Sequence, residues 1–308
     1  MEKTEFKVLL AEKTKTTEES LEQFLPAEDG FAKIVLEAMN YSVRAGGKRL
    51  RPIMMWESFL LCGGAEEDRK LVEPFMAALE MIHTYSLVHD DLPAMDNDRL
   101  RRGKPTTWAV YGETFGILAG DALLNFACET AGLSFDRIPD EDPLKLVRAA
   151  KALQVLAGKA GIFGMIGGQT ADILAEKNET SISEEQLLYI HEKKTAALIQ
   201  AAMMIGGILA GATARQVELL EECALHIGIA FQIQDDILDV IGDTEELGKP
   251  VGSDAANGKQ TYVTRKGLEQ SKADVKRYSE RAIEILRSFE RRNPFLEELV
   301  SELTPRKK

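Results

Sequence analysis

The 308-residue sequence has little of what marks a secreted, membrane-spanning or disulfide-bonded protein. It holds three cysteines, Cys62, Cys128 and Cys223, which stand singly and without CxxC spacing. A disulfide framework or a zinc site is therefore not indicated, and we expect buried thiols in a reducing cytoplasm. The amino terminus is too charged for a signal peptide, and no apolar run approaches the roughly 20 residues that span a bilayer. We expect a cytoplasmic protein.

The sequence also has no excess of basic residues. The chain carries 38 basic and 50 acidic residues, a formal charge of -12. This balance argues against a nucleic-acid partner, because affinity for a polyphosphate backbone comes from basic surface. A phosphorylated substrate would have to bind through local basic clusters or bridging cations. The sequence contains no P-loop or kinase motif, and no Ser/His/Asp or Cys/His nucleophile arrangement.

Apolar residues recur at helical spacing along most of the chain, and no segment alternates with period two. Glycine and proline separate these segments, so the pattern predicts an all-α fold of roughly ten or more helices. No linker divides the sequence, and we expect a single domain over residues 1–308. Segments 114–132 and 196–212 are apolar on more than one face, as in helices buried in a bundle or at a subunit interface. This pattern is consistent with a homodimer.

The first acidic cluster is HDDLPAMDND at residues 89–98. Its four carboxylates repel one another, so gathering them is costly unless cations neutralise them. An apolar helical segment precedes the cluster and predicts that Asp90 lies at a helix end. Pro93 disfavours helical geometry at Leu92, so the chain can bulge and return Asp96 towards Asp90 and Asp91. That arrangement suits a hard, oxygen-ligated ion.

The second acidic cluster is QIQDDILD at residues 232–239. Asp235 and Asp239 are four residues apart, so they lie on one helix face, one turn apart. A DDxxD pattern alone is a weak signal, because exposed acidic turns are common. Here the apolar flanks favour a metal or a basic partner. Oxygen ligands without histidine or cysteine indicate magnesium, and calcium is less well matched because neither cluster has the ligand spacing of a calcium loop.

Two basic clusters could supply counter-charge to a diphosphate: GGKRLRP at residues 46–52 and RLRRGKP at residues 99–105. The planar arginine side chain can bind a diphosphate in two places, and glycine lets backbone amides approach it. Basic stretches beside glycine are usually solvated turns. Arg101 and Arg102, however, directly follow the first acidic cluster, which favours a joint phosphate site.

Taken together, these motifs resemble those of the trans-isoprenyl diphosphate synthases. The resemblance runs from about residue 28 to about residue 265, and it is closest to the bacterial farnesyl diphosphate synthases. It implies an all-α, isoprenoid-synthase bundle around a deep central cavity, a homodimer and magnesium as cofactor. It is carried by GGKRLRP at 46–52, DDLPAMD at 90–96, RRGKPT at 101–106, GGQ at 167–169, KT at 194–195 and FQIQDDILD at 231–239.

The resemblance also implies roles for individual residues. The metal ligands would be Asp90, Asp96 and Asp235. The catalytic group would add Asp91, Asp236, Asp239, Arg101 and Lys194. The allylic substrate would contact Arg101, Lys194, Thr195, Gln232, Lys249 and Lys259. Isopentenyl diphosphate would be held by Lys48, Arg51, His83 and Arg102.

The implied reaction joins isopentenyl diphosphate head to tail with dimethylallyl and geranyl diphosphate to give farnesyl diphosphate. Tyr85 lies five residues before Asp90, about 7.5 Å down a helix axis, where an aromatic ring would close the pocket early. Tyr85 followed by Ser86 matches the C15 pattern of the family, although Tyr85 could also be ordinary core packing. The alternatives are a geranylgeranyl or geranyl diphosphate synthase and a non-catalytic partner subunit. A terpene cyclase would carry a different second motif.

Overall fold

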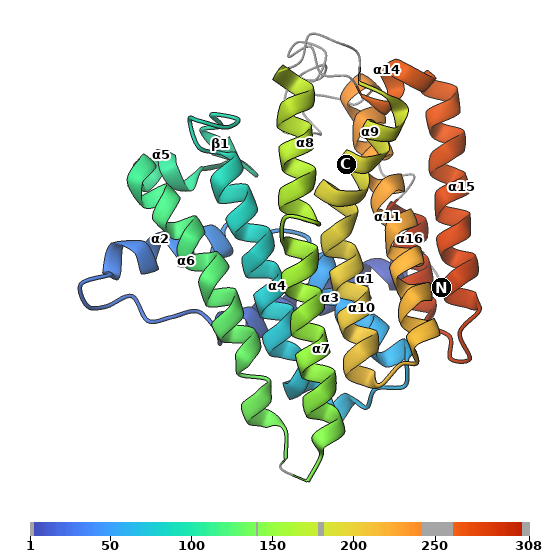
Figure 1. The fold of residues 1–308 in the computed structure, drawn as a ribbon, viewed down its shortest axis with the longest axis horizontal. Coiled ribbons are helices and arrows are strands. Elements are labelled where there is room, and N and C mark those ends of the chain that lie inside the picture. Colours follow the sequence, from blue (N-terminus) through green and yellow to red (C-terminus); the bar gives the residue numbers. More distant parts are fainter. Residues whose placement is uncertain (1–2, 140, 178–181, 242–260, 304–308) are drawn as a thin grey trace.

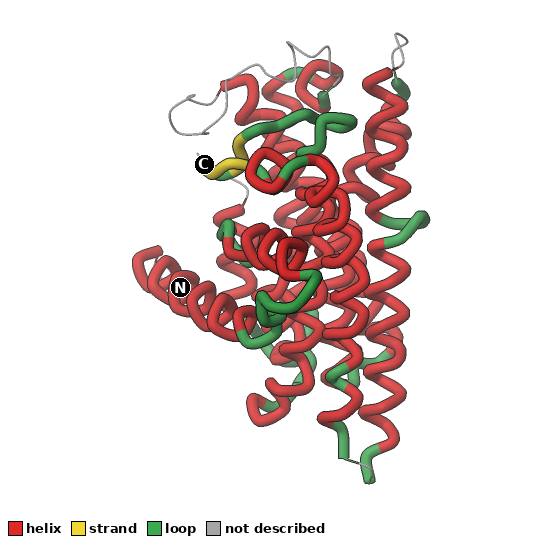
Figure 2. Tube along the Cα trace, turned by 90° about the vertical axis from the view of Figure 1, so that its left-hand side faces the viewer, coloured by secondary structure: helices red, strands yellow, loops and turns green. Residues whose placement is uncertain are grey.

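The computed structural model of the chain describes residues 3–139, 141–177, 182–241 and 261–303. Helices form almost all of this part (Figures 1 and 2), which confirms the predicted all-α class. The helices before the second acidic cluster are α1 (Lys3–Glu22), α2 (Lys33–Arg44), α3 (Leu50–Leu61), η1 (Glu66–Asp68), α4 (Arg69–Asp90), α5 (Thr107–Tyr111), α6 (Glu113–Gly132), η2 (Phe135–Arg137), α7 (Pro143–Ala160), α8 (Met165–Lys177), α9 (Glu184–Ile190), the π-helix η3 (His191–Ala196) and α10 (Ala197–Ala210). The others are α11 (Ala214–Ile241), which carries that cluster, α14 (Tyr262–Lys266), α15 (Leu268–Arg287) and α16 (Pro294–Leu303).

The described residues form one small hairpin of β1 (Leu100–Arg101) and β2 (Lys104–Pro105). Arg102 and Gly103 connect the strands, with φ of 55° and 75°. Positive φ at both central residues is what a two-residue hairpin turn with the right twist requires. The hairpin follows α4 and lies with α9 and α14 at the upper end of the bundle in Figure 1.

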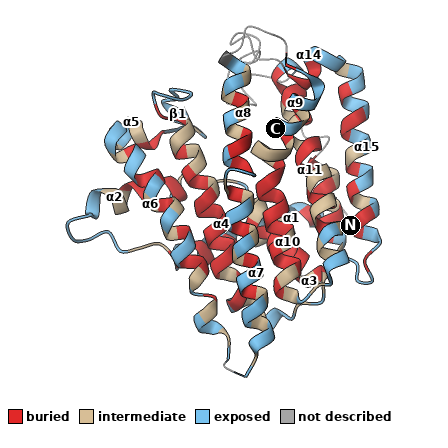
Figure 3. Ribbon diagram, viewed as in Figure 1, coloured by how far each residue is buried: buried red, intermediate tan, exposed pale blue. Residues whose placement is uncertain are grey.

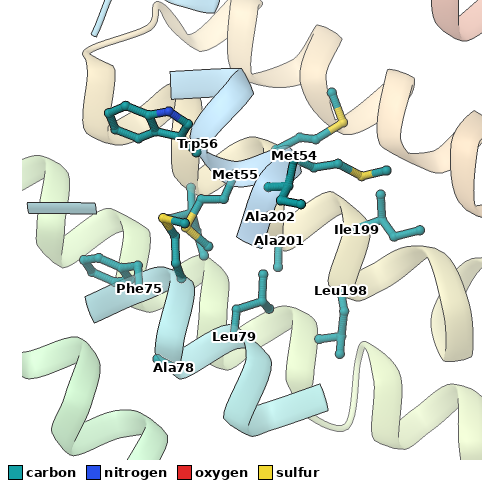
Figure 4. Packing of buried hydrophobic residues seen from close by; sticks show 14 of the residues in the cluster. Met54, Met55, Trp56, Phe75, Ala78, Leu79, Leu198, Ile199, Ala201 and Ala202 are labelled. Carbon is teal, nitrogen blue, oxygen red and sulfur yellow. The ribbon is translucent and has the colours of Figure 1, made fainter. Parts of the chain in front are cut away.

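The hydrophobic core lies where α3, α4 and α10 pack together, and Figure 4 shows side chains from all three helices meeting there. Figure 3 shows buried residues running along the inner faces of these helices. Gly206 lets α10 approach α3 closely, because a Cβ at this position would lie 2.1 Å from the carbonyl oxygen of Met55 in α3. The predicted burial of segment 196–212 is therefore confirmed, since α10 is buried on most sides.

Segment 114–132 was predicted to be buried in a bundle or at a subunit interface, and within the single chain it is partly buried. It forms α6, and its outer face exposes Ile117 and Leu118 to solvent. Cys128 on the same helix is also exposed, so the expected burial of this thiol is wrong, whereas Cys223 is buried and Cys62 is half-buried. The exposed side of α6 is mixed, because Asp121 and Asn125 lie there beside Ile117 and Leu118.

One helical stretch among the described residues, 143–176, is long and apolar enough to cross a membrane by length and composition, and 33% of its most apolar 18-residue window is buried. It comprises α7 and α8. A turn at residues 161–164 interrupts it, and the core helices of water-soluble bundles pass the same test. The feature is therefore weak support for a membrane span.

Candidate active site

The first acidic cluster forms a tight turn at the carboxyl end of α4. The helix ends at Asp90, as the sequence predicts. The backbone N–H of Asp96 then donates to the carbonyl of Asp90 at 2.9 Å, and the N–H of Asn97 donates to the carbonyl of Leu92 at 3.1 Å. The chain thus bulges around Pro93 and brings Asp96 back to the helix end. The predicted return of Asp96 is confirmed.

Asp91 binds Arg101, which the hairpin brings to the same helix end. Arg101 Nε donates to both carboxylate oxygens of Asp91 at 2.8 and 3.0 Å, and Arg101 Nη2 lies 2.6 Å from Asp91 Oδ1. The Asp91 carboxylate is buried, whereas Arg101 is half-buried. A two-point ion pair of this kind fixes the guanidinium plane. Asp91 therefore orients Arg101 beside the acidic cluster.

The environment of the Asp90 side chain disfavours its ionised form. Burial, together with the nearby Asp96 carboxylate, raises the pKa of this carboxyl to about 6, although Lys194 acts in the opposite direction. Gln169 Nε2 of α8 donates to Asp90 Oδ1 at 2.9 Å. The other amide atom, Gln169 Oε1, is buried and has no hydrogen-bond partner among the described residues. Extra positive charge at this point would stabilise the ionised cluster.

A π-helical segment carries Lys194 and Thr195. Residues 191–196 form η3, and such segments inside longer helices often occur at functional sites. Lys194 Nζ binds Asp172 Oδ2 of α8 at 2.5 Å. Asp172 is not among the site residues predicted from the sequence. The sequence feature that could have identified Asp172 is its position three residues after Gln169, because residues at this spacing lie on one face of a helix.

The second acidic cluster lies in the last turns of α11. Thr195 Oγ1 donates to Gln232 Oε1 at 2.9 Å, and Gln232 Nε2 donates to Asp236 Oδ1 at 3.1 Å. The backbone N–H of Tyr262 donates to the other oxygen of Asp236 at 2.8 Å. Asp236 and Asp239 are buried, whereas Asp235 is half-buried. Asp235 is therefore the member of this cluster with solvent access.

Helix α8 and the π-helical segment connect the two acidic clusters. Gln169 reaches Asp90 from one side of α8, and Asp172 reaches Lys194 one turn later. Thr195 then continues the connection to Gln232 on α11. Beside this second half lies a cavity of about 70 Å³, lined by Asp172, Ala175, Glu176, Ile182, Leu187, Ile190, His191, Lys194, Thr195, Gln232, Asp236 and Thr261. Both clusters thus belong to one connected polar region.

Three of the four residues predicted for isopentenyl diphosphate come together beside α4, and we call Arg51, His83 and Arg102 the basic cluster. Burial, followed by the charges of Arg51 and Arg102, lowers the pKa of His83 well below its usual value. Arg102 donates to the carbonyl of Gly46, and a Cβ on Gly47 would lie 2.7 Å from Arg102 Nη1. Glycine at position 47 therefore leaves room for this guanidinium. Lys48, the fourth residue, is exposed.

Tyr85 is buried one turn before His89 on α4. Its ring meets the His89 ring edge to face, with 5.8 Å between centroids. Burial, with the Asp90 charge, raises the pKa of the Tyr85 hydroxyl to about 12. This hydroxyl has no hydrogen-bond partner among the described residues, and Ser86 Oγ donates to the carbonyl of His83 at 2.8 Å. Lys249 and Lys259 lie outside the described residues.

The family model described as polyprenyl synthetase matches residues 32–300. The chain belongs to this family. The polyprenyl synthetase chain is 44% identical over 281 residues to the farnesyl diphosphate synthase of Geobacillus stearothermophilus, which covers 91% of this chain and 90% of the relative. It is 41% identical over 292 residues to the chloroplastic geranylgeranyl pyrophosphate synthase of Capsicum annuum, covering 93% of this chain and 74% of the relative.

The fold of this polyprenyl synthetase is also that of solved relatives. A geranyltransferase from Helicobacter pylori, solved as a complex with magnesium and isoprenyl diphosphate, superimposes with a TM-score of 0.81 at 30% identity, over 96% of this chain and 95% of that chain. The resemblance to the isoprenyl diphosphate synthases and the predicted fold type are therefore confirmed.

Magnesium fits the residues of this polyprenyl synthetase site. Within the described ranges, no three His, Cys, Asp or Glu side chains gather closely enough to hold an ion by themselves. Magnesium does not need such a group, because it keeps water ligands and is usually completed by substrate phosphates around one or two carboxylates. The raised pKa of Asp90 indicates an acidic cluster that cations would stabilise.

Proposed function

We propose that the chain is a magnesium-dependent farnesyl diphosphate synthase. It condenses isopentenyl diphosphate with dimethylallyl diphosphate and then with geranyl diphosphate, releasing diphosphate at each step. The observation that carries this proposal is the polar connection from Asp90 through α8 and the π-helical segment to Gln232 on α11. The 44% identity to a farnesyl diphosphate synthase over most of both chains supports the product.

Asp90, Asp96 and Asp235 are the ligands we assign to magnesium. Bound magnesium would hold the allylic diphosphate and neutralise the charge that grows as this group departs. The proposal draws support from the fit of oxygen ligands to magnesium and from the magnesium complex of the Helicobacter pylori relative. Asp91 and Asp236 support the site indirectly. Asp91 accepts from Arg101, and Asp236 accepts from Gln232 and from the Tyr262 backbone N–H.

Two positive side chains near the acidic clusters, Arg101 and Lys194, would bind the departing diphosphate. Arg101 and Lys194 are each held by a buried carboxylate, so their donors are oriented before substrate arrives. Preorganised donors of this kind stabilise developing negative charge without reorganisation during the reaction. Thr195 and Gln232 would add neutral hydrogen bonds, and we assign Asp239, Lys249 and Lys259 supporting roles on the resemblance alone.

Isopentenyl diphosphate would bind to the basic cluster and Lys48. The lowered pKa of His83 keeps its imidazole neutral at pH 7, so His83 would act as a hydrogen-bond partner and the arginines would supply the charge. The isopentenyl double bond then attacks the allylic cation, and loss of a proton restores an alkene. Water must be excluded during this step, because it would trap the cation.

The chain length of the product depends on Tyr85 in this proposal. The buried ring lies one turn below the acidic cluster, where the growing hydrocarbon tail would extend. A geranylgeranyl diphosphate synthase is the second candidate, because the Capsicum annuum relative matches 93% of this chain. The bulk of Tyr85 favours the shorter C15 product.

We further infer a homodimer in the cytoplasm, with residues 1–308 forming a single polyprenyl synthase domain. The match of the family model to residues 32–300 supports one domain. Ile117 and Leu118, two exposed apolar side chains of α6, would be covered by a second copy. The free thiols of all three cysteines agree with a reducing compartment.

Incubation of the purified chain with isopentenyl and dimethylallyl diphosphates and magnesium tests the proposal. Chromatography of the dephosphorylated products should show farnesol as the main alcohol. Geranylgeraniol as the main product would favour the second candidate. No turnover by the chain alone would contradict an enzyme and favour a non-catalytic partner subunit.

A further inference from the structure

A buried ion pair between Arg49 and Glu80 lies beside the basic cluster and has no part in the substrate binding proposed above. Arg49 Nη1 is 2.8 Å from Glu80 Oε1, and Arg49 Nη2 donates to the carbonyl of Val43 at 2.7 Å. Each side chain is 4% exposed. Arg49 also has a left-handed backbone, with φ of 48°, which is uncommon for a residue other than glycine. A buried ion pair often adds little net stability, but loss of one partner is strongly unfavourable because it leaves the other charge unpaired.

Glu80 is close enough to the basic cluster to influence both of its arginines. It lies on α4 three residues before His83, and residues at this spacing share a helix face. Burial lowers the pKa of Arg51 and of Arg102, and among charged groups Glu80 opposes this lowering most strongly. A carboxylate in this position could bind either arginine if it lost its present partner.

The two arginines of the basic cluster are not engaged by acids. Within the described part of the chain, no carboxylate lies within 4.0 Å of the guanidinium nitrogens of Arg51 or Arg102. Arg51 Nε is buried and has no hydrogen-bond partner there either. Arg102 donates to a backbone carbonyl, that of Gly46. Their charge therefore remains available to an incoming anion.

We propose that Arg49 is a positioning residue which, by binding Glu80, keeps this carboxylate from pairing with Arg51 and Arg102 and so leaves both arginines open to the diphosphate of isopentenyl diphosphate. This role rests on the proposed function. Without Arg49, the buried Glu80 carboxylate needs another cation, because an unpaired buried charge is strongly unfavourable. Arg51 and Arg102 are the cations whose pKa its charge already affects. Glu80 would then compete with the substrate.

Steady-state kinetics with each substrate varied in turn test this role. Arg49→Gln should raise KM for isopentenyl diphosphate about tenfold, while KM for the allylic diphosphate changes less than about twofold. Adding Glu80→Gln to this variant removes the competing carboxylate and should restore KM for isopentenyl diphosphate. Arg49→Lys keeps the positive charge and should raise this KM less than Arg49→Gln does.

Lys13→Gln is the matched control. It likewise leaves a buried carboxylate, Glu57, without its lysine partner, which lies at 2.6 Å. Glu57 is not among the charges that act on Arg51. This variant should lower the melting temperature without raising KM for isopentenyl diphosphate selectively. Such a selective rise in the control would overturn the proposal.

Three results with the Arg49 variants would also overturn it: an unchanged KM for isopentenyl diphosphate in Arg49→Gln, a parallel rise of both KM values, or no restoration by Glu80→Gln. If Arg49→Gln does not fold, Glu80→Gln alone decides, because it should leave KM for isopentenyl diphosphate unchanged or lower it. A tenfold rise there, on the order of 1.4 kcal/mol, would contradict the role. No turnover by the unaltered chain would instead refute the proposed function on which this role rests.

Discussion

Gly168 lies where α8 meets the π-helical segment, and the structure leaves no room there for a methyl group. A Cβ at Gly168 would lie 2.1 Å from the backbone nitrogen of Lys194 and 2.5 Å from the carbonyl carbon of Lys193. Both are backbone atoms, so only a shift of the whole segment can relieve the clash. Overpacking of this kind costs about 1–3 kcal/mol. The same shift would move Lys194 away from Asp172 and from the acidic cluster.

Gly168→Ala should therefore lower both activity and stability. Alanine substitutions at two other glycines serve as controls that separate a loss of activity from a loss of stability. A Cβ at Gly206 would lie equally close to a backbone atom, 2.1 Å from the Met55 carbonyl oxygen, but this contact is in the hydrophobic core and away from the acidic clusters. A Cβ at Gly158, in the last turn of α7, would meet nothing within 4 Å, so Gly158→Ala should be neutral or stabilising by about 0.4–1 kcal/mol. Denaturant unfolding should show similar losses for Gly168→Ala and Gly206→Ala.

The turnover of the folded enzymes then decides whether this contact matters for catalysis. A misplacement of about 1 Å near reacting groups can lower the rate about 100-fold. We expect a loss approaching this size in kcat for Gly168→Ala, and a much smaller one for Gly206→Ala. If Gly168→Ala turned over as fast as Gly206→Ala at the same loss of stability, the assigned role of the α8 contact would be refuted.

Three further predictions concern single residues near the acidic clusters. Tyr85→Ala should lengthen the products, measured by chromatography, whereas Tyr85→Phe should keep C15; an unchanged profile in Tyr85→Ala would remove Tyr85 from this role. Asp172→Asn should lower kcat/KM about tenfold, because Lys194 loses its oriented ion pair, and unaltered kinetics would contradict this. The pKa of Asp90 in the folded state, about 6, is higher than in the unfolded state, so the folded state binds more protons between about pH 4 and pH 6. Without magnesium, the free energy of unfolding should therefore fall as pH rises through this range. Thermal melts of Asp90→Asn should show a weaker fall with pH, and an equal fall would contradict the assignment.

Local features of the sequence predicted the first acidic cluster well. The end of α4 at Asp90 and the return of Asp96 depend on Pro93 and its immediate neighbours, so the sequence contains the information needed. The burial of α10 was equally predictable, because its residues are apolar on all sides.

Contacts between distant helices were not predictable in the same way. Asp172 is one acidic residue among many in the sequence, and only the packing of α8 against the π-helical segment brings it to Lys194. The pairing of Arg49 with Glu80 joins residues 31 positions apart. The exposure of Cys128 also depends on which face of α6 the core covers, and an all-round apolar pattern does not specify that face.

In the proposed mechanism, both acidic clusters act on one diphosphate through shared magnesium. Isothermal titration of inorganic diphosphate in the presence of magnesium tests it directly, with the unaltered chain, Asp90→Asn, Asp235→Asn and the double variant. We expect tight binding to the unaltered chain, a large loss in each single variant, and little further loss in the double variant, because residues that act as a unit are not additive. Unchanged diphosphate affinity in either single variant, or fully additive losses, would contradict a shared site.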